Sequence, residues 1–224
     1  MYGNRSARGL QPLSTGTTTL AFVVNDLVVF ATDTRATAGF FVAHKKAKKV
    51  HKVADNMAMT IAGRVADAQT IIDLMRANVR HYEVTQGKPM QVKAAATLLS
   101  TYLFYYRFFP YQTQLLIGGY DDSGPHIYNV DPFGGVTEEK VISTGSGSPI
   151  ALGVLESEFR DGMGLDEAIE LAYKAVAVAI RRDIGSGDSI EVAYVSPATG
   201  YVELSQPERR RLFERYVRPF IVAP

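Results

Sequence analysis

The sequence predicts an α+β protein built as a four-layer α-β-β-α sandwich, with two antiparallel sheets between two helical layers. Three strand-rich regions alternate with two pairs of helical segments along the 224 residues. Paired helices can cover the outer faces of mainly antiparallel sheets, and two sheets between two such layers would bury all four helices. No internal repeat or interdomain linker interrupts this order, so residues 17–224 are expected to form a single domain.

The first strand-rich region follows a polar N-terminal stretch, residues 1–16, which shows no convincing period and is expected to be a flexible leader. Residues 20–24 and 27–31 are β-rich runs, and the Asn25-Asp26 pair between them suits a hairpin turn. Polar side chains appear abruptly after the second run. Residues 57–62 predict a further short buried strand, closed by Gly63.

A basic run at residues 45–49 precedes that strand. Lys45, Lys46 and Lys48 are most simply read as a solvated face. If the stretch continues as a strand, alternation of side chains places Ala47, Lys49 and His51 on one face.

Helical periodicity predicts two consecutive helices in the middle of the chain. Apolar residues recur at three- and four-residue spacing from residue 65 to residue 82, and Gly87-Lys88-Pro89 stops that helix. The second helix is predicted over residues 92–109, ending before Pro110. Its aromatic stripe is more simply core than a base-stacking surface.

The second half repeats the alternation. Strands are predicted at residues 114–120, 126–130 and 136–143, and a Gly-Ser loop then leads into a helix with Ser148 as N-cap and Pro149 at the first helical position. Another helix is predicted over residues 165–184. A last hairpin follows at residues 190–195 and 201–204, and a charged tail from Glu208 opens a terminal helical stub.

Composition excludes several functional classes. Lys and Arg number 24 against 23 Asp and Glu, so the net charge of +1 argues against a nucleic-acid binder. The absence of cysteine removes disulfides, thiolate metal sites and a cysteine nucleophile. Residues 1–16 lack the apolar stretch of a secretory signal, and no segment reaches the ~18 apolar residues of a membrane span. We therefore expect a cytoplasmic protein without membrane attachment.

The junction between Gly16 and Thr17 suggests a specific chemistry. A hydroxyl is a poor nucleophile unless a base lies nearby. If the Gly16–Thr17 bond were cut, Thr17 would carry its own base, an α-amino group with a pKa of roughly 7.7–8.0. This is the N-terminal threonine variant of the catalytic triad. The alternative is that the threonines at 17–19 simply begin a β-strand.

Other catalytic devices are absent from the sequence. It contains no G-x-S-x-G, H-E-x-x-H, P-loop or complete G-x-G-x-x-G motif. The four histidines (His44, His51, His81 and His126) lack the spacing of metal ligands. The loop at residues 145–148 could cradle a phosphate with its N–H groups, but no basic side chain follows it in the loop.

Six motifs, in this order, resemble the catalytic β subunits of the proteasome core particle. They are Gly16-Thr17-Thr18-Thr19-Leu20-Ala21-Phe22, residues 31–39 (ATDTRATAG), Lys48-Lys49-Val50, Ile61-Ala62-Gly63, Gly145-Ser146-Gly147-Ser148 and residues 182–188 (RDIGSGD). The resemblance covers residues 17 to about 204, and the short leader is similar to that of archaeal-type subunits. It implies the N-terminal-nucleophile (Ntn) hydrolase fold.

The resemblance also implies roles for individual residues. Thr17 would be the nucleophile that attacks the Gly16 carbonyl to release the leader, residues 1–16. Asp33 and Lys49 would be the charged pair beside it, and Gly63 would offer its N–H to the oxyanion. The group around the free amine would be Ser146, Asp183 and Ser186. The pocket for the residue before the scissile bond would be lined by Ala36, Thr37, Ala47, His51, Ile61 and Val65, which implies hydrophobic preference.

The resemblance implies a threonine endopeptidase that hydrolyses unfolded polypeptides and uses no metal or other cofactor. Seven β subunits would form a ring, and two such rings would stack between rings of α subunits. The chain has no P-loop, so ATP-driven unfolding would need a separate unfoldase. Two alternatives remain: a non-catalytic structural ring subunit, and a small-molecule amidase of the same nucleophile class.

Overall fold

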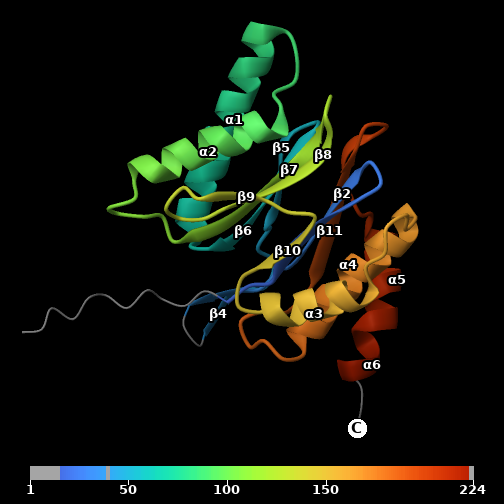
Figure 1. Cartoon of the computed structure of the whole chain (residues 1–224). Coiled ribbons are helices and arrows are strands. Elements are labelled where there is room, and N and C mark those ends of the chain that lie inside the picture. The colour runs from blue at the N-terminus through green and yellow to red at the C-terminus, as the bar shows by residue number, and fades with distance from the viewer. Residues whose placement is uncertain (1–15, 39–40, 222–224) are drawn as a thin grey trace, which may run out of the picture.

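The computed structural model describes residues 16–38 and 41–221. Of the predicted leader, only Gly16 falls within this range, so the prediction for residues 1–15 lies outside the described residues. Two five-stranded sheets and one two-stranded hairpin make up the β structure, and every strand pair is antiparallel. Mixed helices and antiparallel sheets, as the sequence predicts, are confirmed (Figure 1).

The first sheet has the strand order β10-β1-β2-β11-β12. Its members are β1 (Thr19–Val24), β2 (Leu27–Asp33), β10 (Val141–Thr144), β11 (Ile190–Ser196) and β12 (Gly200–Glu203). Alternation along β1 is clear, because Leu20 and Phe22 pack toward helices while Ala21 between them faces the other sheet. The predicted hairpin around Asn25 is confirmed, and Asn25 adopts a φ of 52°.

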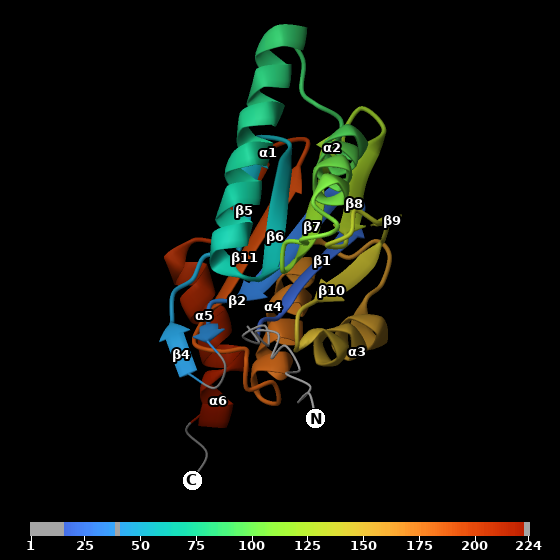
Figure 2. The same ribbon diagram turned by 90° about the vertical axis from the view of Figure 1, so that its left-hand side faces the viewer.

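The second sheet has the order β5-β6-β7-β8-β9. It comprises β5 (Val50–Ala54), β6 (Met57–Gly63), β7 (Thr113–Asp121), β8 (Gly124–Val130) and β9 (Val136–Glu138). A small hairpin of β3 (Ala36–Ala38) and β4 (Phe41–His44) stands apart from both sheets, near α5 in Figure 2. Phe30, Leu116 and Ile127 belong to the apolar core between the two large sheets.

Helices cover the two outer faces. On the second sheet lie α1 (Val65–Gln86) and α2 (Val92–Tyr105); on the first lie α3 (Ser148–Glu158), α4 (Leu165–Ile180) and α5 (Gln206–Tyr216), followed by the short α6 (Arg218–Ile221). The apolar side chains of α4 are almost all buried against the first sheet. Within residues 16–38 and 41–221, no helix is long and apolar enough to cross a membrane.

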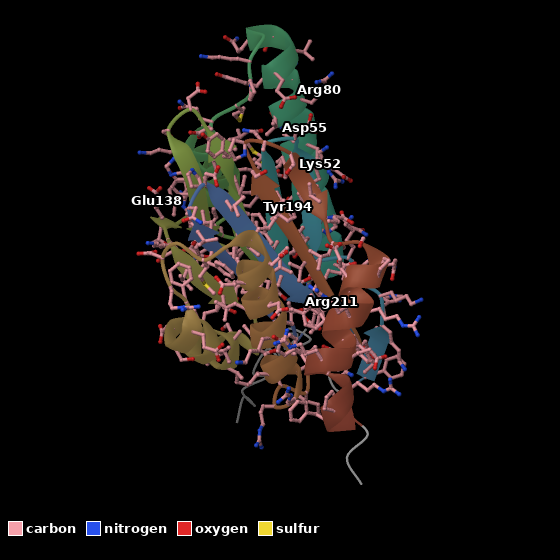
Figure 3. The ribbon with its side chains drawn as sticks, turned by 90° about the vertical axis from the view of Figure 1, so that its right-hand side faces the viewer. Lys52, Asp55, Arg80, Glu138, Tyr194 and Arg211 are labelled. Carbon is pink, nitrogen blue, oxygen red and sulfur yellow. The ribbon has the colours of Figure 1, made fainter. Side chains whose placement is uncertain are left out.

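Local signals explain where several helices begin and end. Gly87 takes the left-handed φ of 67° that ends α1, as its position predicts. A capping box between Ser205 and Glu208 begins α5, so the predicted terminal helix is confirmed two residues earlier than Glu208. Among the exposed ion pairs, Lys52 of β5 and Asp55 of the following turn lie 2.5 Å apart, on the side drawn in Figure 3.

The strand predicted over residues 136–143 is wrong, because the chain changes sheets within it. Residues 136–138 form β9 beside β8, and the Glu139 N–H still donates to the Ile127 carbonyl in that sheet at 3.0 Å. The next carbonyl, that of Lys140, accepts from Val23 N–H in the first sheet at 2.8 Å. The resulting β10 then pairs with β1.

Two helices are shorter than predicted. α2 ends at Tyr105 because residues 106–109 form tight turns ahead of Pro110, which cannot continue a helix. α4 ends at Ile180 because the chain then bends. The bend brings the Asp183 carboxylate into hydrogen-bond contact with Ser146 Oγ. Ser148 is also one position off: Gly147 is the N-cap of α3, and Ser148 lies in the first turn.

The basic run is not a strand over its whole length. β5 begins only at Val50, and residues 47–49 form an extended connection in which Ala47 N–H donates to Thr34 O. The predicted alternation of side chains between two faces therefore does not apply before Val50, because the chain is not a strand there. Ala47, Lys49 and His51 nevertheless line the same cavity, together with Lys48 between them.

Candidate active site

Thr17 lies directly before β1, at the end of the first sheet, and is 3% exposed. Its Oγ1 accepts a hydrogen bond from Lys49 Nζ at 2.9 Å. Lys49 in turn donates to Asp33 Oδ1 at 2.7 Å, and Asp33 is the last residue of β2. The antiparallel register of β1 and β2, which pairs Thr19 with Thr32, brings Asp33 beside the start of β1.

Asp33 is fully buried and both of its carboxylate oxygens are occupied. Oδ1 accepts from Lys49 Nζ and from Thr18 N–H at 2.9 Å. Oδ2 accepts from Arg35 N–H at 3.0 Å and from Gly187 N–H at 2.9 Å. Four donors therefore fix this carboxylate, and through it they fix the direction of the Lys49 side chain.

The lysine is electrostatically unusual. Burial lowers the pKa of Lys49 from its ordinary value of 10.5, and the negative charge of Asp33 opposes this shift without cancelling it. A lowered pKa brings the ammonium closer to the range in which a group can both give and accept a proton near neutral pH. Lys49 is thus suited to exchange a proton with the Thr17 hydroxyl it contacts.

A second hydrogen-bonded group lies on the other side of Thr17. The Thr17 N–H donates to Ser146 Oγ at 3.1 Å, and Ser146 Oγ–H donates to Asp183 Oδ2 at 2.7 Å. The same Asp183 oxygen accepts from Ser186 Oγ at 2.5 Å, and Ser186 Oγ lies 2.7 Å from Thr18 Oγ1. We call these side chains the polar cluster: Thr17, Thr18, Asp33, Lys49, Ser146, Asp183 and Ser186.

Gly16 and Gly185 make a very close contact. A Cβ added to Gly185 would lie 2.3 Å from Gly16 Cα, and one added to Gly16 would lie 2.1 Å from Gly185 Cα. Non-bonded atoms do not approach this closely. In the uncleaved chain, positions 16 and 185 must therefore both be glycine for steric reasons. The residue before Thr17 is therefore held against the bend that carries Asp183 and Ser186.

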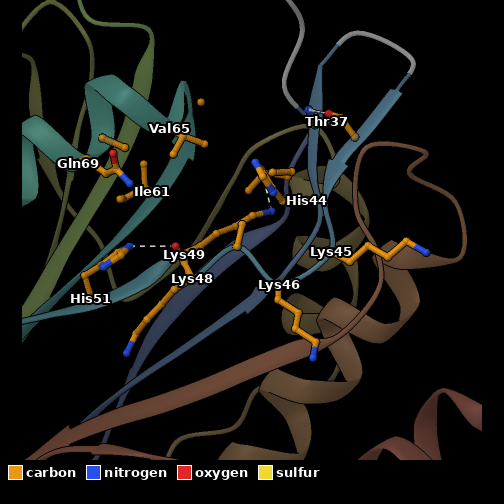
Figure 4. Close-up of a pocket in the computed structure, with 16 residues that line it drawn as sticks. Thr37, His44, Lys45, Lys46, Lys48, Lys49, His51, Ile61, Val65 and Gln69 are labelled. Atoms are coloured by element: carbon orange, nitrogen blue, oxygen red, sulfur yellow. Dashed lines mark hydrogen bonds between the residues drawn. The ribbon is translucent and has the colours of Figure 1, made fainter.

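A cavity of about 620 Å³ opens beside Thr17. All six side chains predicted to form the substrate pocket line it: Ala36, Thr37, Ala47, His51, Ile61 and Val65. Gly63 lies on its wall with a φ of +131°, and the Gly16 N–H reaches across to Thr37 Oγ1 at 2.8 Å. Ile61 of β6 with Val65 and Ala68 of α1 gives the cavity an apolar wall, while the long side chains of Lys45, Lys46 and Lys48 extend away from Ile61 and Val65 (Figure 4).

His51 adds a polar group to this wall without adding charge. Its Nε2 lies 3.0 Å from the Lys48 carbonyl, the contact drawn as a dashed line in Figure 4. Burial lowers the pKa of His51 to about 4. The ring is therefore neutral at physiological pH, and its Nε2 is assigned as the donor to the carbonyl oxygen. The cavity wall keeps a neutral imidazole beside its apolar surface.

The sequence did not single out several residues that the fold brings to the site. Thr18 and Gly185 contact the polar cluster and Gly16, while His44, Ala68 and Gln69 join the cavity lining. Thr18 and Gly185 lie inside the motifs at residues 16–22 and 182–188. Their position beside predicted site residues was the only feature of the sequence that could have indicated them. Gln69 lies one turn after Val65 on α1, and helical spacing could have indicated it.

The Gly-Ser loop is occupied by contacts within the protein. Gly147 N–H donates to Thr17 O at 3.2 Å, Ser148 N–H to Gly145 O, and Gly145 N–H to Gln114 Oε1. Each of these amides already has an acceptor within the protein, which leaves the phosphate interpretation without support. In the described parts of the chain, no group of three or more His, Asp or Glu side chains could hold a metal ion.

Comparison of the sequence with known proteins places this chain in a family. A family model described as "Proteasome subunit" matches residues 13–195. The chain is 50% identical over 202 residues to "Proteasome subunit beta 2" of Staphylothermus marinus, covering 90% of this chain and 94% of that protein. It is 49% identical over 187 residues to "Proteasome subunit beta" of Methanoregula boonei (83% and 88% covered). It is 50% identical over 182 residues to the protein of that name in Archaeoglobus fulgidus (81% and 85%). The resemblance inferred from the motifs is confirmed, and the chain belongs to the proteasome subunit family.

Proposed function

We propose that this chain is a threonine-type endopeptidase of the Ntn-hydrolase class, with Thr17 as nucleophile. The observation that carries the proposal is the contact of 2.9 Å between Thr17 Oγ1 and Lys49 Nζ, with Asp33 holding the lysine from behind at 2.7 Å. A buried hydroxyl within hydrogen-bond reach of a lysine whose pKa is lowered matches the geometry of an activated nucleophile. The first step would be self-cleavage between Gly16 and Thr17.

In self-cleavage, Thr17 Oγ1 attacks the carbonyl carbon of Gly16 while the neutral amine form of Lys49, which the lowered pKa makes accessible, takes the hydroxyl proton. The C–O bond forms, the C–N bond to Thr17 breaks, and the Thr17 nitrogen receives a proton. Water then hydrolyses the ester, which leaves a carboxylate on Gly16 and a free amine on Thr17. Close contact between Gly16 and Gly185 supports this step, because it restricts where the carbonyl can lie.

In peptide hydrolysis, the same hydroxyl attacks a substrate carbonyl, the scissile C–N bond breaks and the amine fragment leaves with a proton. Water then hydrolyses the acyl-enzyme ester and releases the carboxylate fragment. The freed Thr17 amine acts as base, with an unperturbed pKa of roughly 7.7–8.0. Its orientation would come from Ser146, which already lies 3.1 Å from Thr17 N and is itself bonded to Asp183. The Gly63 N–H would stabilise the oxyanion, a contribution typically worth about 10²–10³ in rate.

The substrate class follows from the cavity beside Thr17. Apolar walls from Ile61 and Val65 favour a hydrophobic side chain before the scissile bond, and the cavity volume of about 620 Å³ accommodates a large one. His51 leaves the wall uncharged. We infer unfolded polypeptides as substrates, cut preferentially after hydrophobic residues.

The domain organisation and assembly are part of the same proposal. Residues 1–16 would be a removable leader, and residues 17–224 one domain with the four-layer α-β-β-α order of the Ntn-hydrolase fold. The three apolar cores, one between the sheets and one under each helical layer, support that order. As a member of the proteasome subunit family, the chain assembles with other proteasome subunits. We infer rings of seven β subunits stacked between α-subunit rings, with a separate ATP-dependent unfoldase and a cytoplasmic location.

The test is co-expression with α subunits, followed by N-terminal sequencing and intact mass of the assembled chain. We expect Thr17 as the first residue and hydrolysis of a hydrophobic peptide. Thr17→Ala should assemble, keep its leader and lack turnover, while Thr70→Ala on the exposed side of α1 should match the wild type. Unchanged turnover in Thr17→Ala would eliminate the nucleophile.

The two alternatives predict different results in the same experiment. A structural ring subunit would assemble but neither lose its leader nor cleave peptides. A small-molecule amidase would be active without α subunits and would spare long peptides.

A further inference from the structure

The bend between α4 and β11, residues 181–189, carries three residues that contact neighbours of Thr17 (Ser146, Gly16 and Thr18) but belongs to no helix or strand. Asp183, Gly185 and Ser186 all lie in it. Its internal bonds are short-range: Ser186 N–H donates to Asp183 O and Gly185 N–H to Asp183 Oδ1, both at 3.2 Å, Ser189 N–H donates to Gly187 O at 3.0 Å, and Ser186 Oγ–H donates to Asp183 Oδ2 at 2.5 Å. Contacts with the rest of the protein must therefore fix its position.

One side chain reaches both halves of the bend. Arg35, two residues after the end of β2, donates from Nε to Asp188 Oδ2 at 3.0 Å and from Nη1 to the Ile184 carbonyl at 3.2 Å. Ile184 precedes Gly185-Ser186 and Asp188 follows them. The guanidinium thus spans the segment that touches Gly16 and Thr18.

The guanidinium also lies flat against the backbone between these two anchors. A Cβ at Gly187 would lie 2.2 Å from Arg35 Cζ, so the close approach needs glycine there. The Arg35 N–H and the Gly187 N–H donate to the same oxygen of Asp33. One residue therefore links the bend to the carboxylate that orients Lys49.

Asp188 has an unusual backbone conformation. Its φ is +69°, in the left-handed region that side chains other than glycine rarely adopt. Such conformations persist where surrounding contacts fix them, and they concentrate at functional sites. The Asp188 side chain is 16% exposed and forms an ion pair with Arg35.

We propose that Arg35 is a positioning residue that, through Asp188 and Ile184, holds the 183–187 bend against Thr17. The inference rests on the proposed function. Loosening the bend displaces Ser186 and Asp183, and with them Ser146, which bonds the Thr17 nitrogen. The cavity is formed by other elements, including β6 and α1, so substrate binding is retained while the chemical step slows.

The experiment compares variants in particles assembled from chains expressed to begin at Thr17, so that self-cleavage does not limit activity. Arg35→Lys keeps the charge but loses the planar fork that reaches two acceptors. We expect kcat to fall at least tenfold with KM within twofold of the wild type. Arg215→Lys is the matched control: Arg215 binds both oxygens of Glu170 at 2.8 Å, on α5, and its kcat should be unchanged.

Two substitutions at Asp188 separate positioning from stability. Asp188→Gly removes the acceptor but tolerates the left-handed φ, so kcat should fall at least tenfold while the thermal midpoint stays equal or rises. Asp188→Asn keeps an oxygen acceptor and should stay within threefold of wild-type kcat. A kcat loss that tracks the thermal midpoint, or equal kcat in the Gly and Asn variants, would overturn the proposal.

The wild type distinguishes this proposal from the one on which it rests. Turnover in the wild type together with wild-type kcat in Arg35→Lys removes only the positioning role. Absence of turnover in the wild type removes the proposed peptidase activity and the positioning role together.

Discussion

In the polar cluster, donors and acceptors meet at 2.5–3.1 Å, whereas the cavity next to it has an apolar wall of Ala36, Ala47, Ile61, Val65 and Ala68. Asp33 accepts four hydrogen bonds; Ile61 and Val65 offer only van der Waals contact. Buried polar groups tolerate little displacement, because each lost partner leaves another group unsatisfied. Apolar walls can change shape at smaller cost.

The comparison assigns the two regions different tasks. Substitutions in the polar cluster should affect every substrate alike, including the chain's own leader. Substitutions in the apolar wall of the cavity should change the ranking of substrates and spare self-cleavage, because Gly16 has no side chain to place against that wall. The predictions below test this division, beginning with the largest expected effect.

Substitutions at the adjacent residues Lys48 and Lys49 give the strongest test of this division. Lys49→Arg keeps a charge but moves the donor away from Thr17 Oγ1, and peptide turnover should fall about 10²–10⁴-fold, the usual contribution of a proton-transfer group. Lys48→Arg is the control, since Lys48 is half-exposed and pairs with Glu203. The measurement is kcat on a hydrophobic peptide. Equal effects at the two positions would remove the distinction between the polar cluster and its surroundings.

Gly185→Ala should affect self-cleavage more than peptide turnover. The added methyl group would overlap Gly16, and overpacking of ~1–3 kcal/mol corresponds to leader release roughly 5–150-fold slower. The overlap with Gly16 disappears once Gly16 has left, and the added Cβ then has only the milder contact of 3.1 Å with Ser146 Oγ. Leader release followed by mass spectrometry, compared with turnover by chains expressed from Thr17, measures the difference.

The control for this substitution is Gly153→Ala in α3, where an added Cβ meets nothing within 4 Å. It should leave both rates unchanged. A Gly185→Ala chain that lost its leader at the wild-type rate would contradict the close contact.

Ile61→Val should change substrate ranking without changing self-cleavage. Removing one methylene from the cavity wall should shift the kcat/KM ratio of phenylalanine over leucine, before the scissile bond, about tenfold toward phenylalanine. Ile117→Val makes the same change in the neighbouring strand β7, where the residue is buried but does not line the cavity. If both variants shifted the ratio equally, the cavity would not be the selective element.

The smallest effect concerns pH and His51. Its pKa is lowered to about 4 in the folded chain, so between pH 6.5 and 4 the unfolded chain binds a proton that the folded chain does not. Stability therefore falls as pH falls through that window, on the order of 1 kcal/mol after allowance for the partly exposed ring.

The measurement is urea unfolding of the wild type and His51→Asn at pH 7.5 and 4.5. Asparagine does not titrate there, so the variant should lose less stability between the two pH values. An equal loss in both chains would show that His51 is not buried as described.

Within the polar cluster, local sequence alone indicated only Thr17, whereas the roles of Asp33, Lys49, Ser146, Asp183 and Ser186 were implied by the family resemblance. Thr17 stands before an apolar strand, Asp33 ends the next one, and a hairpin of this length brings the two strand ends together. The lysine could be named only through the family motif. Lys49 lies in the segment before Val50, which is not a strand. The alternation of side chains along a strand therefore could not predict where its side chain points.

Other parts of the site depend on contacts between distant segments. Gly185 meets Gly16, and Ser186 meets Thr18, although some 168 residues separate each pair in sequence. The predicted ends of two elements were also wrong. The strand predicted over residues 136–143 divides between two sheets, and the helix predicted over residues 92–109 ends before the turns that precede Pro110. No local pattern encodes such contacts, since they exist only after the sheets have paired.

The sequence by itself determined the element types, the antiparallel α+β class and the family, because periodic burial and short motifs are properties of neighbouring residues. Tertiary structure alone decided that the strand predicted over residues 136–143 splits between two sheets, and that the bend after α4 closes on Thr17. It also set the lowered pKa of Lys49. That shift arises from burial, and burial is produced by the packing of segments that are far apart in the chain.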